Sequence, residues 1–177
     1  MVAFEKDKAM FNFRVAGVAI HNGRILLDRN TRNSYWVLPG GHPDMMEPMA
    51  EALQREVLEE IGETVKVVHL LWVLENFFHK KKDFHELSFY FLMELDPNSR
   101  LLKSDGPFYG QEHDHQLIFQ WFQLDEAILR SLPFYPGCLV QAVTHLPETP
   151  QHMVFYDTGA CRPQDNKDLR SQRLTIP

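Results

Sequence analysis

The stretch that decides the fold runs from Gly41 to Glu63 and reads GHPDMMEPMAEALQREVLEEIGE. Its second half has the pattern of an amphipathic helix from Pro48 to about Ile61. Proline suits the first turn of a helix, because its missing N–H would have no partner there. Apolar residues recur at helical spacing and predict a buried face of Ala50, Leu53, Val57 and Ile61. Gly62 is a natural helix stop.

Acidic residues gather on another face of the same predicted helix. Glu56, Glu59 and Glu60 stand at i, i+3 and i+4, so their carboxylates project from one side, and Glu63 extends that side by a turn. Three carboxylates on one face suit a hard divalent cation, and Mg²⁺ fits better than Zn²⁺, which prefers thiolates and imidazoles. The alternative is an ordinary solvated face, since glutamate is a good helix former.

The spacing of the whole stretch separates these alternatives. Eight residues have the spacing of one known motif: Gly41, Glu47, Arg55, Glu56, Val57, Glu59, Glu60 and Gly62. Seven of these positions, all except the aliphatic Val57, require a single residue type. A match at all seven by chance has a probability on the order of one in 10⁸ per window. This stretch resembles the Nudix box, and the similarity extends over about Phe11 to His145. Glu63 departs from the aliphatic residue usual at the last position, and Asp44 and Met46 depart from frequent Glu and Gly.

The resemblance implies an α/β protein with the Nudix fold, an α/β/α sandwich with a mixed β-sheet and a central loop–helix–loop metal site. It implies Glu56, Glu59 and Glu60 as metal ligands, with the carbonyl of Gly40 as a further ligand and Mg²⁺, or Mn²⁺ as a substitute, as the cofactor. Arg55 and Glu47 are the implied pair that braces the loop against the helix, a role that suits the bidentate guanidinium. The turn at Gly40 and Gly41 is expected to bring the backbone close to substrate phosphates.

The implied reaction is Mg²⁺-dependent attack of water on a pyrophosphate in a nucleoside diphosphate linked to another moiety, such as a nucleotide sugar, ADP-ribose or a nucleoside triphosphate. A carboxylate must accept the proton of the water. The candidate catalytic residues are Glu56, Glu59, Arg55 and Glu112, with Glu86 as a weaker option for the base. Arg29 and Arg32 are predicted phosphate contacts by position only. A non-catalytic nucleotide sensor is the alternative, and the intact glutamates favour the enzyme.

The flanking sequence predicts mostly strands, followed by short helices. Strands are expected at Phe11–Ile20, Arg24–Asp28, Val65–Phe78, Phe84–Leu95, Leu117–Leu124 and Met153–Tyr156. Asn22-Gly23 is a hairpin signal between the first two of these strands. Pro97–Asp114 reads as a polar loop. Asp125 is expected to cap a short helix, and Pro136–His145 to form another.

The 177 residues fit one domain over 1–156 with a polar tail at 157–177. The net charge of −6 argues against binding nucleic acid polymers, so a small nucleotide is the expected partner. The chain has no apolar run of about 18 residues, so no membrane partner is expected. Cys138 and Cys161 lack metal-ligand spacing, and a cytoplasmic location with free thiols follows. A homodimer through the two long strands is the alternative to a monomer.

Overall fold

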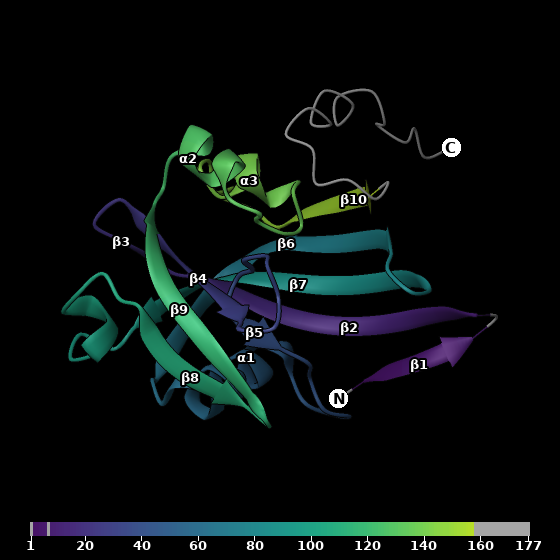
Figure 1. Ribbon diagram of the computed structural model, residues 1–177, viewed down its shortest axis with the longest axis horizontal. Coiled ribbons are helices and arrows are strands. Elements are labelled where there is room, and N and C mark those ends of the chain that lie inside the picture. The colour runs from purple at the N-terminus through teal and green to yellow at the C-terminus, as the bar shows by residue number, and fades with distance from the viewer. Residues whose placement is uncertain (1, 7, 158–177) are drawn as a thin grey trace.

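The computed structural model describes residues 2–6 and 8–157, and within them the strands form two sheets with helices on both sides (Figure 1). The first half contains β1 (Ala3–Lys6), β2 (Ala9–Val18), β3 (Ile20–His21), β4 (Arg24–Asn30), β5 (Gly40–Gly41), α1 (Met49–Ile61) and β6 (Val65–His79). The second half contains β7 (Asp83–Leu95), a 3-10 turn (Arg100–Leu102), β8 (Phe108–Glu112), β9 (His115–Gln123), α2 (Glu126–Ser131), α3 (Leu139–Ala142) and β10 (Gln151–Asp157).

The larger sheet is mixed. Its strand order is β1-β2-β7-β6-β10, with β5 paired to β2. The pairs β2/β7 and β6/β10 are parallel, whereas β1/β2 and β6/β7 are antiparallel. The smaller sheet has the order β3-β4-β9-β8 and is antiparallel throughout. Figure 1 shows β4, β9 and β8 crossing in front of the larger sheet.

Two apolar clusters fill the interior, one on each side of the strands. On β4, Leu26 belongs to the cluster that contains the buried face of α1, while Ile25 and Leu27 belong to the cluster beneath α2 and α3. This alternation follows from the pleat, since successive side chains of a strand point to opposite faces. The strands are therefore covered on both faces, by α1 on one side and by α2 and α3 on the other (Figure 1).

The structure confirms most of the predicted elements and corrects two of them. The hairpin at Asn22-Gly23 has positive φ at both residues, as a type I′ turn requires. The predicted loop 97–114 is wrong in part, because it contains a 3-10 turn and strand β8. The predicted helix 136–145 is helical only over α3. On α1, Ala52 rather than Ala50 completes the fully buried face, and Glu60 is buried beside it.

The predicted domain boundary and dimer stay predictions. Residues 158–177, to which most of the proposed tail belongs, lie outside the described residues. β7 lies between β2 and β6, and β6 lies between β7 and β10, so neither long strand offers a free edge to a second copy. A dimer contact through these two strands would have to use a face of the sheet. Within residues 2–6 and 8–157, no helix has both the length and the apolar character needed to cross a membrane.

Candidate active site

Helix α1 fixes the direction of the glutamates. Pro48 precedes the helix in an extended conformation, and Gly62 ends it in the left-handed conformation at φ 73°. There the N–H of Gly62 donates to the carbonyl of Leu58 at 2.9 Å. Leu53 and Val57 are buried against the sheets, which holds the helix in one rotation about its axis. The acidic side of the helix therefore has a single direction in the fold.

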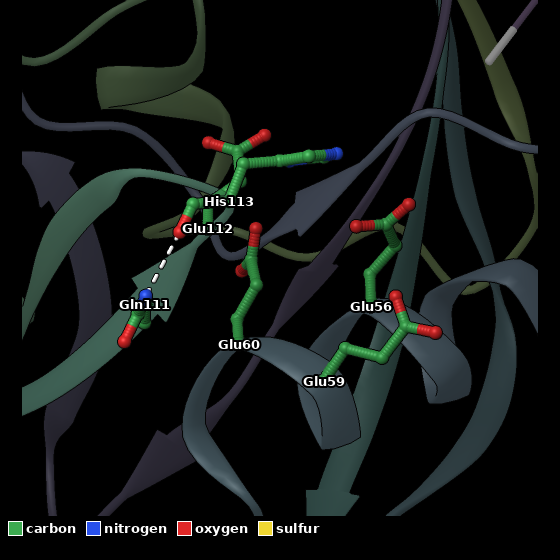
Figure 2. Close-up of a pocket in the computed structure, with 6 residues that line it drawn as sticks. All are labelled: Glu56, Glu59, Glu60, Gln111, Glu112 and His113. Carbon is green, nitrogen blue, oxygen red and sulfur yellow. Dashed lines mark hydrogen bonds between the residues drawn. The ribbon is translucent and has the colours of Figure 1, made fainter.

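That acidic side lines an open cavity of about 230 Å³ between α1 and the β8–β9 hairpin. The residues that line it are Glu56, Glu59, Glu60, Gln111, Glu112 and His113. Figure 2 shows the Glu60 carboxylate extending from α1 toward Glu112, with Glu56 and Glu59 beside it. The structure thus brings the three predicted helix glutamates together with Glu112. Glu112 lies at the end of β8 rather than on the loop where the sequence placed it.

Gly41 makes room for one of these carboxylates. A Cβ atom at position 41 would overlap the carboxylate of Glu56. Glu56 also accepts a hydrogen bond from Nη1 of Arg55 at 2.9 Å and a backbone hydrogen bond from His42. Burial nevertheless raises the pKa of Glu56, and the nearby charge of Glu59 adds to this effect. The glycine therefore allows a charged side chain to pack directly on the β5 backbone.

Arg55 joins the loop before α1 to the helix through a bidentate ion pair. Its Nε donates to Oε1 of Glu47 at 2.7 Å, and its Nη2 donates to Oε2 at 2.8 Å. The backbone N–H of Asp44 donates to the same carboxylate at 2.8 Å. The hydrogen bonds from Arg55 hold the pKa of Glu47 down at about 2. Arg55 also donates to Glu59 at 3.1 Å but does not itself line the cavity.

Glu60 is the most unusual member of the site. Its side chain is only 6% exposed, and its Oε2 has no hydrogen-bond partner among the described residues. Burial, together with the charges of Asp28 and Glu112, raises the pKa of Glu60 to about 9. An ionised carboxylate in this position is costly unless a positive charge accompanies it.

Two residues that sequence reasoning missed shape this site. Gly110 on β8 faces the end of α1, where a Cβ atom would overlap the carbonyl oxygen of Glu60. This close approach sets Glu112 across the cavity from the helix. Asp28 on β4 is 5% exposed, and burial raises its pKa to about 7 despite the nearby charge of Arg14. Gly110 looked like a loop glycine, but an aspartate within the apolar run of β4 was a signal available in the sequence.

The donor set fits a divalent cation in its chemistry. Four carboxylates line one cavity, and Glu60 carries a buried oxygen without a partner. Oxygen donors of this kind suit Mg²⁺ or a similar hard ion. Across residues 2–6 and 8–157, however, no three His, Cys, Asp or Glu side chains are gathered closely enough to enclose an ion. Gly40 pairs with Ala16 and does not line the cavity, so its role as a ligand stays a prediction.

Three other predicted residues lie away from the cavity lining. The guanidinium of Arg29 lies 5.0 Å from the ring centre of Trp36, and Arg32 is exposed in the turn after β4. Their contact with phosphate stays a prediction. Glu86, the weaker candidate for the base, is buried on β7 and accepts hydrogen bonds from Asn12 at 2.6 Å and Ser88 at 3.0 Å. Because its carboxylate is engaged there and absent from the cavity lining, Glu86 does not fit that role.

Comparison with known proteins identifies the family. The sequence profile of the NUDIX domain matches residues 11–140, which is most of the chain. The chain belongs to the NUDIX family. The segment from the β2 strand to α3, with the glutamate helix at its centre, is thus a NUDIX domain. The layered arrangement of mixed sheet and flanking helices is the Nudix fold, as the sequence predicted.

The relatives of this NUDIX protein agree with that assignment. A MutT-like protein of Streptomyces ambofaciens is 41% identical over 63 residues, which are 35% of this chain and 41% of the relative. The mutator MutT protein of Bacillus halodurans shares the fold with a TM-score of 0.59 and 22% identity, over 83% of this chain and 90% of its own. A MutT NUDIX hydrolase of Burkholderia pseudomallei gives a TM-score of 0.50 and 27% identity, over 65% and 84%. A UDP-X diphosphatase gives 0.54 and 23%, over 80% and 66%. The chain spans less than two thirds of the length of the MutT-like protein of Streptomyces ambofaciens.

Proposed function

We propose that this NUDIX protein is a Mg²⁺-dependent hydrolase that cleaves the pyrophosphate bond of a nucleoside diphosphate linked to another moiety. The observation that carries the proposal is Glu60, a buried carboxylate with an unpartnered oxygen that lines a cavity with three more glutamates. Such a cavity repels an anionic substrate unless a cation is present. A bound cation would stabilise the ionised carboxylates and would attract the phosphate groups of the substrate.

In this proposal Glu56, Glu59 and Glu60 hold the cation. When bound, Mg²⁺ supplies positive charge that neutralises phosphoryl oxygens and lowers the pKa of a water molecule. Arg55 keeps Glu56 and Glu59 in place, because it donates to both carboxylates while it is fixed to Glu47. Neighbours that orient metal ligands in this way typically change metal affinity by about 10–100-fold when they are removed.

Glu112 is our candidate for the proton acceptor. Glu56 and Glu59 both accept hydrogen bonds from Arg55, so their carboxylates are already engaged. Within the described part of the chain, the carboxylate of Glu112 has no hydrogen bond or ion pair. It faces the α1 glutamates across the cavity (Figure 2). A water molecule between them would lie within reach of an unengaged carboxylate.

Hydrolysis of a substrate panel tests this proposal. The panel contains ADP-ribose, nucleotide sugars, dinucleoside polyphosphates and nucleoside triphosphates, each with Mg²⁺ and with EDTA, and the products are resolved by ion-exchange chromatography. We expect Mg²⁺-dependent release of a nucleoside monophosphate or of phosphate products from at least one class. Tight binding of a nucleotide without any turnover would overturn the hydrolase and favour a nucleotide sensor.

A further inference from the structure

A row of five aromatic rings crosses the larger sheet. Phe4 on β1 is paired with Phe11 on β2, and Phe11 is paired with His85 on β7. His85 is paired in turn with Phe77 on β6, and Phe77 with Tyr156 on β10. The centres of neighbouring rings lie 4.4–5.5 Å apart. The five rings, which we call the aromatic row, therefore form one continuous surface from β1 to β10.

The aromatic row lies on the same face of the sheet as α1, but beyond the helix. Phe89 follows His85 by four residues on β7, so both point to one face, and Phe89 packs against the cluster that contains α1. The rings of the row belong to neither apolar cluster of the described residues. Phe4 and Tyr156 are 54% and 57% exposed, and Figure 1 shows the strands extending past α1 toward the β6–β7 turn. Contiguous exposed apolar surface of this kind is typical of a protein–protein contact.

The acidic groups beside the aromatic row are paired with histidines. Oε1 of Glu75 lies 2.8 Å from Nε2 of His152, and its Oε2 lies 3.6 Å from Nε2 of His85. Nearer the β6–β7 turn, Oδ1 of Asp83 lies 2.8 Å from Nδ1 of His79. Nucleic acid and anionic membranes bind clusters of unpaired basic residues. An aromatic surface with paired charges, on a chain of net charge −6, favours an apolar protein surface as its partner.

The size of this surface suits a second copy of the same sheet. Neighbouring strands are about 4.8 Å apart, so the five strands span about 19 Å. The next residues on the same face, Phe13, Leu87 and Val154, widen the apolar surface along the strands. A face-to-face contact would bury roughly 500 Å² on each copy, and the total of about 1,000 Å² is the lower limit for a specific interface.

We propose that the aromatic row is a homodimer interface, in which the larger sheets of two copies of this chain pack face to face. A twofold contact brings the same patch of both copies together, so an apolar row meets an apolar row and no unpaired charge is buried. Apolar sheet faces pack in this way about 10 Å apart. No residue of the row lines the glutamate cavity, and the proposal is independent of the reaction proposed for that cavity.

Sedimentation equilibrium of the full chain tests this inference. Wild type is compared with Phe4→Glu and Tyr156→Glu, which place a charge at opposite ends of the row. Both positions are exposed, so the variants should fold, and far-ultraviolet circular dichroism checks this. We expect wild type to dimerise with a dissociation constant in the micromolar range, as suits an interface of about 1,000 Å². Each variant should raise this constant at least about tenfold, because a carboxylate would be buried against an apolar partner.

The matched control is Tyr109→Glu, since Tyr109 on β8 of the smaller sheet is exposed to the same extent as Tyr156, at 57%. Its dissociation constant should stay within about twofold of wild type. A wild type that remains monomeric up to about 200 µM would overturn the inference and leave the row to a different partner. Unchanged dimerisation of either Phe4→Glu or Tyr156→Glu would also overturn it, and so would an equal loss of dimer in Tyr109→Glu.

Discussion

Replacing Glu60 with glutamine should stabilise the cation-free protein, and the gain should grow with pH. In the folded chain burial raises the pKa of Glu60 from 4.5 to about 9. Between these two values the folded state keeps a proton that the unfolded state has released. The free energy of unfolding therefore falls as pH rises, by about 1.4 kcal/mol per pH unit. Between pH 5.5 and pH 8 this amounts to about 3 kcal/mol.

Glutamine has a shape similar to that of glutamate and does not titrate, so the Glu60→Gln variant does not lose this unfolding free energy as the pH rises. The difference in unfolding free energy between Glu60→Gln and wild type should widen by about 3 kcal/mol from pH 5.5 to pH 8. Urea denaturation in EDTA, followed by tryptophan fluorescence, measures the difference at each pH. Glu51→Gln changes an exposed residue of the same helix, and its free energy of unfolding should equal that of wild type at both pH values. Saturating Mg²⁺ at pH 8 should stabilise wild type more than Glu60→Gln.

The reasoning fails if the two proteins lose stability in parallel between pH 5.5 and pH 8. That result would mean that Glu60 ionises as freely in the folded chain as in the unfolded one. It would also remove the main physical argument for a bound cation, because a carboxylate that ionises freely in the folded chain does not require a cation to stabilise it.

Three further predictions follow from the geometry. Glu112→Gln should lower kcat by about 10²–10⁴-fold with unchanged Mn²⁺ affinity, and a loss below about tenfold in steady-state kinetics would be too small for a general base. Gly110→Ala should lower kcat on the order of 10²-fold, because the added methyl group meets the Glu60 carbonyl and moves Glu112. Gly137→Ala is the control, since nothing lies within 4 Å of the added atom, and its kcat should match that of wild type. Arg55→Lys loses the bidentate fork, so it should bind Mn²⁺ about 10–100-fold more weakly in titrations. Since Arg55 holds the pKa of Glu47 near 2, the stability that this pair contributes is complete above pH 4.5 and is lost toward pH 2. The stability gap between wild type and Arg55→Lys in urea titrations should therefore narrow over that range, and a constant gap would argue against the ion pair.

The glutamate helix was predictable because it depends on local periodicity, whereas the Nudix fold was predicted from the resemblance to the Nudix box. Leu53, Val57 and Ile61 repeat at helical spacing, and Asn22-Gly23 specifies its turn through residues that tolerate positive φ. Strand β8 was missed because Gly106, Pro107 and Gly110 resemble loop residues. Gly110 is instead required by contact with Glu60, far away along the chain.

The same distinction explains which site residues the sequence supplied. Glu56, Glu59 and Glu60 lie within two turns of one helix, so their common face follows from spacing alone. Asp28 lies on another strand, and the effect of its charge on the pKa of Glu60 depends on how the sheets pack against α1. Burial of Glu60 likewise depends on tertiary packing, since its position in sequence looks as exposed as that of Glu59.

The most direct test of the cavity as a cation-dependent catalytic site is the turnover of Glu60→Gln against Glu51→Gln. Both replace one glutamate of α1 by its amide, but only the first removes a carboxylate from the cavity. With the best substrate of the panel and saturating Mg²⁺, we predict that kcat falls by orders of magnitude in Glu60→Gln and is unchanged in Glu51→Gln. Equal turnover of the two variants would contradict the account.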